Sequence, residues 1–312
     1  MATDAVDSTR TEEPLGGVEV AKGAKGTTRR IGSGRGQVIV RAVLTVICLL
    51  WTIPTIGLLV SSFRSPDAVG ISGWWTVLAS PLDFTQWTLQ NYSEVLFTNG
   101  MGSAFVNSLV VTVPATVIPI TAAAFAAYAF AWMRFPGREL LFVMLVGLLV
   151  VPLQVAFIPL VRLYGGLGLN GTFAAVWLAH TGFGMPLAIY LLRNYMGSLP
   201  VEVVESARVD GASHFQTFWR LMIPLSVPVL AAFAIFQFLW VWNDLLVALI
   251  FLGGTPDVQV VTLNLQNLIG SRGQDWHLLT AGGFITMIIP LIVFFSLQRY
   301  FVRGLTAGSV KG

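Results

Sequence analysis

Few side chains of this chain could do covalent chemistry or hold a metal. Its three histidines, His180, His214 and His277, are too scattered in the sequence to suggest a metal site. A single cysteine, Cys48, allows neither a disulfide framework nor a cysteine metal cluster. The glycine-rich run 32–36 lacks the lysine of a phosphate-binding loop. We therefore expect no catalytic residue, no metal and no cofactor on this chain.

Polar and aromatic side chains inside long apolar stretches offer another chemistry, the binding of a polar solute. A charged group at the centre of a bilayer costs about 2.5–3.5 kcal/mol on insertion scales, so each one needs a reason. Amides and carboxylates can hydrogen-bond to hydroxyl groups, and aromatic faces can stack on sugar rings. The alternative role is hydrogen bonding between helices, worth about 0.6 kcal/mol on average. The candidates for lining a translocation path are Gln154, His180, Phe183, Asn243 and Asp244.

Membrane-spanning helices must position these side chains. Of the 312 residues, 55% are hydrophobic and 11% are charged, which leaves too little polar surface to cover a soluble globule. A spanning helix needs about 20 mostly apolar residues. Pro152, Pro159, Gly184 and Pro186 could unwind such helices beside a water-filled cavity. We expect six spans, at 42–61, 104–131, 140–160, 172–192, 226–251 and 278–298.

The distribution of basic residues predicts the orientation. Lys and Arg accumulate on the cytoplasmic side of membrane proteins. They are frequent before the first span, in the second and fourth loops and after the last span, whereas only Arg64, Arg162 and Arg272 fall on the opposite side. Both termini are therefore expected in the cytoplasm, and the net charge of +3 gives no reason to expect nucleic-acid binding. Residues 1–36 are expected to form a flexible cytoplasmic tail before a transmembrane domain at 37–312.

A polar insert at 198–224, between the fourth and fifth spans, carries the signals of ordered structure. Pro200 suits the first position of a helix, and Gly211 suits the left-handed closure of that helix. Ser213 and Gln216 have the spacing of a capping box that starts the next helix. We expect two short helices with a bend between them. The alternative is an amphipathic linker helix on the membrane surface, but the insert lacks a broad apolar face.

This insert resembles the EAA loop of ABC-importer permeases, whose pattern reads Glu-Ala-Ala, two residues, Asp-Gly-Ala, and then spaced aromatic and proline residues. Ser206 departs from the usual alanine but stays small. The resemblance implies an all-α integral membrane fold of the MetI-like type, with six transmembrane helices and a cytoplasmic coupling helix that docks on an ATPase. The matching residues are Glu205, Ser206, Ala207, Asp210, Gly211 and Ala212, followed by Phe218, Pro224 and Pro228.

The segment after the sixth span, 298–312, is similar to the ending of the maltose-type (MalG-like) carbohydrate permeases. In that group the tail reaches the ATPase dimer. The alternative is a basic tail attracted to anionic lipid, although only three of its fifteen residues are basic. The likeness covers most of residues 90–312. It implies that Gly304, Leu305, Gly308 and Lys311 contact the ATPase.

The resemblance also implies a function and partners. The chain would be one permease of a pair, usually with a non-identical second permease, in a bacterial cell membrane. An extracytoplasmic solute-binding protein would deliver a carbohydrate such as an α-glucoside oligosaccharide, and the external loop 253–277 is a candidate contact for it. ATP and Mg would bind to the partner ATPase dimer. Because Asn243 and Asp244 are common to such permeases whatever the sugar, we favour a structural role for them and leave both roles open for the other three candidates.

Two other functions stay open. An ABC importer for a non-sugar solute, such as a peptide or a polyamine, would share the EAA loop but not the sugar-permease ending. An ion-coupled secondary transporter would need ionisable relays at the middle of the membrane, and only Asp244 is available. A membrane enzyme would need a catalytic cluster, which the sequence lacks.

Overall fold

The computed structural model describes residues 34–269 and 275–307. The chain divides into two compact units, Met1–Thr52 and Ile53–Gly312. In the first unit, the beginning of the long helix α1 (Gly34–Ser62) is described. The predicted tail, 1–36, lies outside the described residues up to position 33.

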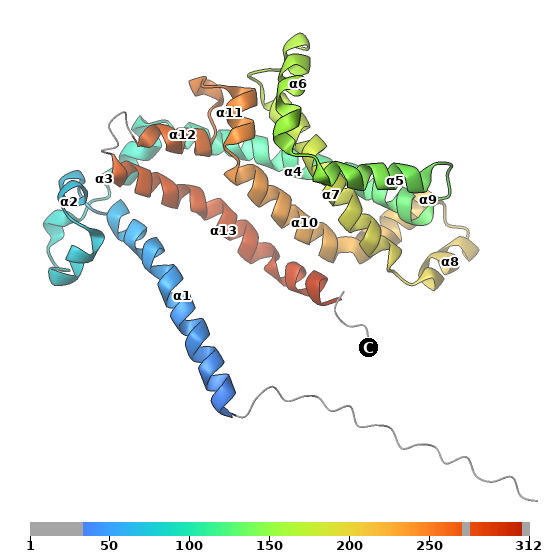
Figure 1. Cartoon of the computed structure of the whole chain (residues 1–312), viewed down its shortest axis with the longest axis horizontal. Coiled ribbons are helices and arrows are strands. Elements are labelled where there is room, and N and C mark those ends of the chain that lie inside the picture. The colour runs from blue at the N-terminus through green and yellow to red at the C-terminus, as the bar shows by residue number, and fades with distance from the viewer. Residues whose placement is uncertain (1–33, 270–274, 308–312) are drawn as a thin grey trace, which may run out of the picture. The chain divides into compact units, whose positions relative to one another are not determined.

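The long helices confirm the prediction of an all-helical membrane protein (Figure 1). Among the described residues, five helical stretches are long and apolar enough to cross a membrane, and a bent pair of helices supplies a sixth if it is counted as one span. The five lie in α1, α4 (Met101–Trp132), α7 (Phe173–Gly197), a stretch that ends with α10 (Ile223–Asn243), and α13 (Trp276–Ala307). The bent pair is α5 (Arg138–Gly147) and α6 (Leu153–Gly166).

The predicted third span, 140–160, is sharply bent at Pro152, one of the residues expected to unwind a helix. A short 3-10 turn, η4 (Leu148–Val150), follows α5, and α6 then leaves at 101° to it. The cause is Pro152, which disfavours helical geometry at the residue before it and lacks an N–H donor. Val151 accordingly has an extended ψ of 122°. The other prolines predicted to unwind helices do not: Pro159 lies inside α6 and Pro186 inside α7.

The predicted fifth span is also interrupted. It is divided into α10 and the short helix α11 (Leu246–Leu252), because Asp244 leaves the helical conformation with a ψ of 126°. The Asp244 carboxylate oxygen Oδ2 accepts hydrogen bonds from the backbone N–H groups of Val247 (2.8 Å) and Ala248 (3.3 Å). The side chain therefore caps the N-terminus of α11 and satisfies amides that the break leaves without helical partners.

Small residues allow α4 and α7 to pack closely. Ala115, Ala123 and Ala127 on α4, and Ala175 and Ala188 on α7, are completely buried. Such residues let helix backbones approach one another in a membrane, where hydrophobic burial alone gives helices no reason to associate. The helix α10 packs on α4, α7 and α13, so α4, α7 and α10 form the centre of the second unit.

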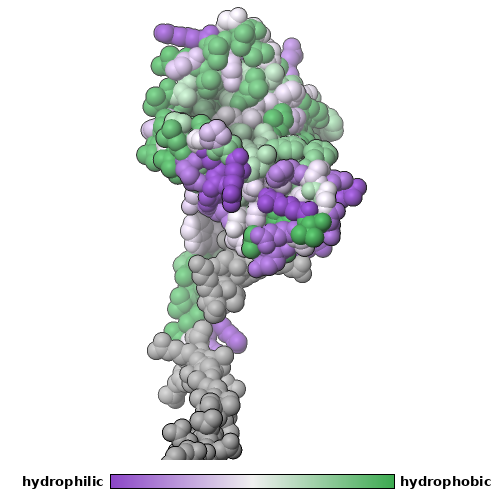
Figure 2. Space-filling model, turned by 90° about the vertical axis from the view of Figure 1, so that its right-hand side faces the viewer, coloured by the Kyte–Doolittle hydropathy of each residue, from purple (hydrophilic) through white to green (hydrophobic). Residues whose placement is uncertain are grey.

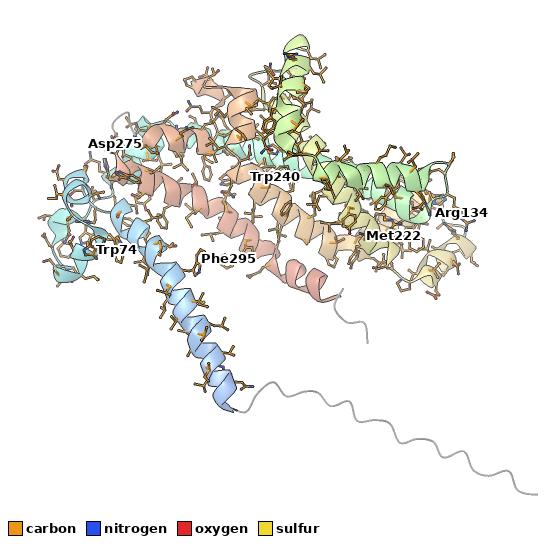
Figure 3. All side chains as sticks on the ribbon, in the orientation of Figure 1. Trp74, Arg134, Met222, Trp240, Asp275 and Phe295 are labelled. Carbon is orange, nitrogen blue, oxygen red and sulfur yellow. The ribbon has the colours of Figure 1, made fainter. Side chains whose placement is uncertain are left out.

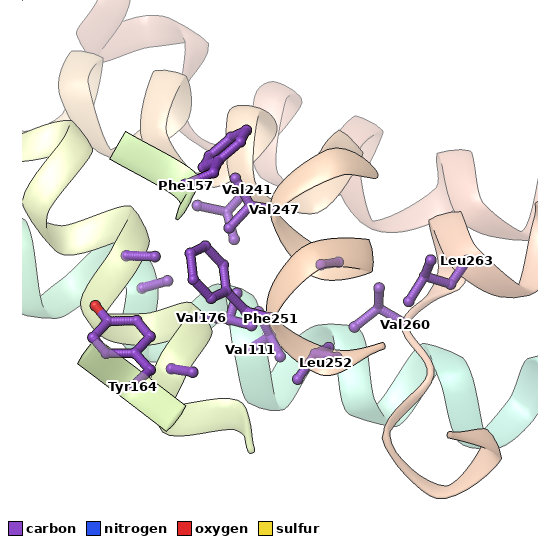
Figure 4. Packing of buried hydrophobic residues seen from close by; sticks show 14 residues of the cluster. Val111, Phe157, Tyr164, Val176, Val241, Val247, Phe251, Leu252, Val260 and Leu263 are labelled. Atoms are coloured by element: carbon purple, nitrogen blue, oxygen red, sulfur yellow. The ribbon is translucent and has the colours of Figure 1, made fainter. Parts of the chain in front are cut away.

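One end of this bundle is held by aromatic packing and by side-chain bonds to a loop. Figure 4 shows Phe251 of α11 between Phe157 and Tyr164 of α6, with ring centroids 6.2 and 5.4 Å away. The Asn107 side chain of α4 donates to the backbone carbonyls of Asp257 (3.0 Å) and Gln259 (2.9 Å). These contacts fix the start of the loop 253–277, the predicted binding-protein contact, against α4. The loop contains η6 (Pro256–Val258) and α12 (Val261–Leu268), and residues 270–274 lie outside the described part.

The segment between α1 and α4 folds around a buried arginine. Arg64 is 2% exposed, and its guanidinium donates to the backbone carbonyls of Ser72 and Gly73, both at 3.1 Å. Burial lowers the pKa of this guanidinium from its usual value. The short helices of the segment are α2 (Pro66–Ile71), η1 (Trp74–Ala79), η2 (Phe84–Gln86), α3 (Gln90–Ser93) and η3 (Glu94–Thr98).

Candidate functional site

The EAA-like sequence forms a short helix and a tight turn at the opposite end of α4 from Asn107. The helix α8 (Val201–Val209) has Glu202 in its first turn and Arg208 in its last, as the helix dipole favours. Pro200 is the N-cap rather than the first helical residue that the sequence predicted. Val204 is 1% exposed and belongs to the hydrophobic core, so it anchors α8 to the bundle.

Gly211 closes α8 as predicted. Its φ is +78°, in the left-handed region that side chains with a Cβ avoid. The Gly211 N–H donates to the carbonyl of Arg208 (3.0 Å), and the Ala212 N–H donates to that of Ala207 (2.9 Å). This pair of bonds is a Schellman motif, which satisfies the last carbonyls of the helix. The left-handed conformation of Gly211 therefore sets the direction in which the chain leaves α8.

The predicted capping box is present, but the second helix is not a separate one. The Ser213 hydroxyl accepts from the Gln216 N–H (3.3 Å), and the Gln216 side chain accepts from the Ser213 N–H (2.9 Å). The helix α9 (His214–Thr217) then continues through a π-helical turn, η5 (Phe218–Met222), directly into α10. The prediction of two short helices was thus wrong for the second, because local capping signals mark where a helix starts and not where it ends.

The matched residues border an open groove. A cavity of about 390 Å³ is lined by residues from both arms of the turn. Glu205, Ser206, Asp210 and Gly211 are exposed, as the docking prediction requires. Figure 2 looks onto this side of the molecule and shows hydrophilic residues gathered among hydrophobic ones. The lining residues are Ala207, Asp210, Gly211, Ala212, Gln216, Thr217, Arg220 and Leu221.

The candidate lining residues are only partly brought together. His180 of α7, 1% exposed, places its Nε2 atom 3.8 Å from Oδ2 of Asp244. Phe183 lies one turn further along α7, with its ring 5.9 Å from that of Phe157. Asn243 is exposed and donates to the carbonyl of Leu239 in its own helix (2.8 Å).

Gln154 stands apart from the other candidates. It is exposed on α6, and among the described residues no hydrogen bond or ring contact joins it to them.

Gln237, a fully buried amide in α10, was not among the residues predicted from the sequence. Its Nε2 donates to the backbone carbonyl of Ala115 on α4 (3.1 Å) and to that of His180 on α7 (3.4 Å). One side chain thus joins the three central helices. Gly184 makes room for it, since a Cβ there would lie 2.7 Å from Gln237 Oε1. Gly184 was predicted to be able to unwind α7. Instead α7 is continuous at this position, and Gly184 allows close packing. An amide within an otherwise apolar span was the signal that could have revealed Gln237.

A hollow with three aromatic residues in its wall lies beside Gln237 and His180, at the bend between α5 and α6. It has a volume of about 220 Å³, and Phe183 and Trp240 form part of its wall. The Trp240 ring meets the His180 ring edge to face, with centroids 5.2 Å apart. Figure 3 labels Trp240 between the ends of the bundle, away from Arg134 at the α8 end. The hollow is lined by Leu148, Leu149, Val151, Leu153, Phe183, Gly184, Pro186, Leu187, Phe236 and Trp240.

The predicted tail contacts are only partly described. The backbone of α13 runs through Gly304 and Leu305, whereas Gly308 and Lys311 lie outside the described residues. A metal site is not found among the described residues, which contain no group of three His, Cys, Asp or Glu side chains able to hold an ion.

Fold and loop together define a polytopic membrane protein with an exposed short helix and tight turn at one end. Residues 119–307 match the model of the family described as "Binding-protein-dependent transport system inner membrane component", and the chain belongs to this family. Membership confirms the recognition made from the EAA-like residues and, with the helical fold, the permease architecture.

This chain is similar in sequence to two named permeases, and in fold to a solved structure, over most of its length. It is 64% identical to the "Osmoprotective compounds uptake permease protein GgtD" of Synechocystis sp., over 86% of this chain and 90% of the relative. It is 47% identical to the "Alpha-glucoside transport system permease protein AglG" of Rhizobium meliloti, over 86% and 95%. A chain from the crystal structure of a bacterial alginate ABC transporter has the same fold, with a TM-score of 0.61 at 14% identity over 84% of this chain and 93% of that one.

Proposed function

We propose that this chain is one permease of an ATP-driven importer for a carbohydrate of the α-glucoside class. The observation that carries the proposal is the exposed α8 turn, closed by Gly211 beside an open groove, in a chain of this permease family. A partner ATPase would dock there and supply the energy, with ATP and Mg bound to that partner. The name of the 47% identical relative supports an α-glucoside as the solute.

The remaining parts of the assembly follow from this role. A second permease would complete the translocation path, and an extracytoplasmic solute-binding protein would deliver the sugar to the end where α11 and α12 lie. The α8 end and both termini would face the cytoplasm. Because the ATPases are drawn together when ATP binds, they would move the two α8 helices and turn the path outward, and hydrolysis would reverse the change.

A second solute class is favoured by one observation. The 64% identical relative is named for osmoprotective compounds, so a small polar osmolyte is the alternative cargo. A carbohydrate and an osmolyte would both suit a path with aromatic faces and few charges. Measuring which solute stimulates the complex distinguishes the two.

We expect the purified complex to hydrolyse ATP faster when an α-glucoside is present. The complex would be isolated from native cells through a tag on this chain, reconstituted in liposomes with its binding protein, and tested with maltose, trehalose and sucrose. Lactose and cellobiose serve as controls without an α-glucosidic bond, and glycine betaine represents a non-sugar osmolyte. Stimulation by glycine betaine alone would assign the second solute class. The importer function itself is contradicted if no nucleotide-binding protein is isolated with the chain.

A further inference from the structure

A side-chain hydrogen bond joins the α8 turn to α4. The hydroxyl of Tyr128, near the end of α4, lies 2.9 Å from Nδ1 of His214, the first residue of α9. Tyr128 is 5% exposed, so its hydroxyl has little access to water as a replacement partner. His214 follows Ser213, the N-cap of α9, which fixes the backbone that carries the imidazole. The bond therefore links two well-positioned groups that lie 86 residues apart in the sequence.

Aromatic packing surrounds this hydrogen bond. Phe218, 3% exposed, stacks on Phe125 of α4 with ring centroids 4.5 Å apart and meets Tyr128 edge to face at 5.5 Å. Trp219 meets the edge of Phe125 at 5.9 Å. We call these five residues, Phe125, Tyr128, His214, Phe218 and Trp219, the aromatic junction. Tyr128 and Phe218 are buried, whereas Phe125, His214 and Trp219 are exposed. The two buried rings pack against each other, and close-packed side chains transmit displacement with little slack.

A continuous backbone beside the junction connects the α8 turn to α10. Between α9 and α10 the helix passes through the π-helical turn η5, a geometry that is uncommon and often found at functional sites. Movement of the α8 turn reaches α10 along this backbone. It reaches α4 through the junction and through one further bond, from Arg208 to the carbonyl of Trp132 (3.3 Å). Because α4 packs along α7, displacement of α4 would also move the helix that carries His180.

We propose that Tyr128 and His214 form a transmission contact that passes movement of the α8 turn to α4 during the transport cycle. This inference rests on the proposed function, because it assumes that a partner moves α8. Both are positioning residues, and neither touches nucleotide or solute. The bond makes α4 move together with α10, so that each ATP hydrolysed displaces all three central helices, α4, α7 and α10. Without it, the ATPases would still cycle, but fewer cycles would open the path.

The test is to remove the hydrogen bond without emptying the junction. Tyr128→Phe deletes one hydroxyl, and His214→Ala deletes the partner ring. His214→Asn should retain the uptake per ATP that His214→Ala loses, because the asparagine side chain can place a hydrogen-bonding atom near the position of Nδ1. Tyr195→Phe is the matched control, since the Tyr195 hydroxyl donates to the carbonyl of Leu225 (3.3 Å), a contact between α7 and α10 that leaves the α8 turn untouched.

The readouts are complex assembly, ATP hydrolysis and uptake of maltose, trehalose or sucrose in the same reconstituted liposomes. We expect Tyr128→Phe and His214→Ala each to lower uptake per ATP about fivefold, the equilibrium effect of losing one ordinary hydrogen bond. The double variant should be no worse than either single one, because residues that share one contact are not additive. His214→Asn and Tyr195→Phe should behave like wild type.

Three outcomes would overturn the inference. Wild-type uptake per ATP in Tyr128→Phe would show that the bond transmits nothing. Additive losses in the double variant would show that the residues act separately. Loss of the assembled complex in both single variants would assign them a role in folding. If the wild-type complex itself shows no ATP-driven uptake of the three sugars, then the proposed function fails, which is a result distinct from these three.

Discussion

Replacing Gly211 with proline should leave the subunit in the membrane and reduce ATP-driven uptake at least about tenfold. Proline fixes φ near −65°, whereas Gly211 needs +78°, and proline cannot supply the N–H that bonds to Arg208. The Schellman closure of α8 would be lost, and the helix would no longer present its exposed face at the correct angle. Hydrophobic spans should still insert, because the change lies outside them. Immunoblotting of membranes and uptake in intact cells would measure both effects.

One further variant at Gly211 separates backbone strain from loss of the hydrogen bond, and a glycine variant elsewhere serves as the control. Gly211→Ala keeps the N–H and meets no atom within 4 Å, so only the left-handed φ opposes it, at roughly 1–2 kcal/mol. It should show an intermediate loss of uptake. Gly197→Ala, at the end of α7, has open space and an ordinary φ, and it should behave like wild type. Normal uptake in Gly211→Pro would contradict the coupling role of α8.

Asp244→Ala should cost about tenfold in uptake, whereas Asp244→Asn should be close to wild type. The carboxylate accepts from the Val247 and Ala248 N–H groups at the break between α10 and α11. Loss of a side chain that caps the start of a helix in this way costs about 0.5–2 kcal/mol. Asparagine retains an oxygen acceptor at that position. In the alanine variant α11 should fray, and Phe251 would no longer hold α6 firmly through Phe157.

Hydrogen exchange over residues 245–252 measures this fraying directly. The exchange rate should rise in Asp244→Ala and stay near wild type in Asp244→Asn. If both variants lose uptake equally while exchange stays unchanged, then the charge itself is required. That result would contradict the capping role and favour the alternative of an ion-coupled carrier, for which an ionisable group at this depth is essential.

The structure of the EAA-like loop, 198–224, could be predicted because its signals are local. The left-handed closure at Gly211 and the Ser213–Gln216 capping box each depend on residues within a few positions of one another, and both were found. The family could be recognised for the same reason, since the EAA pattern is a short contiguous segment. Hydropathy likewise located the apolar stretches, because a bilayer requires a minimum length of apolar helix.

The missed features depend on residues far apart in the sequence or on the direction of the chain. Hydropathy measures how apolar a stretch is and carries no information on its direction. Pro152 indicated where the third span could be interrupted, but not that the chain turns by 101° there. Gln237 bonds to backbone atoms 122 and 57 residues away, so no local pattern reveals its partners. Gly184 was interpreted as a helix breaker, although its role depends on that amide lying opposite.

Crosslinking from Ser206 is the most direct test that α8 docks on a nucleotide-binding partner. Ser206 is exposed on α8, and its replacement by cysteine in a Cys48→Ser background leaves one reactive thiol on the chain. Ser80→Cys, exposed in the segment between α1 and α4, is the control position. With a short bifunctional maleimide in native membranes, Ser206→Cys should capture an ATP-binding protein, in a yield that changes on adding ATP, and Ser80→Cys should not. Failure of Ser206→Cys to capture any ATP-binding protein, in membranes that still show uptake, would contradict the account.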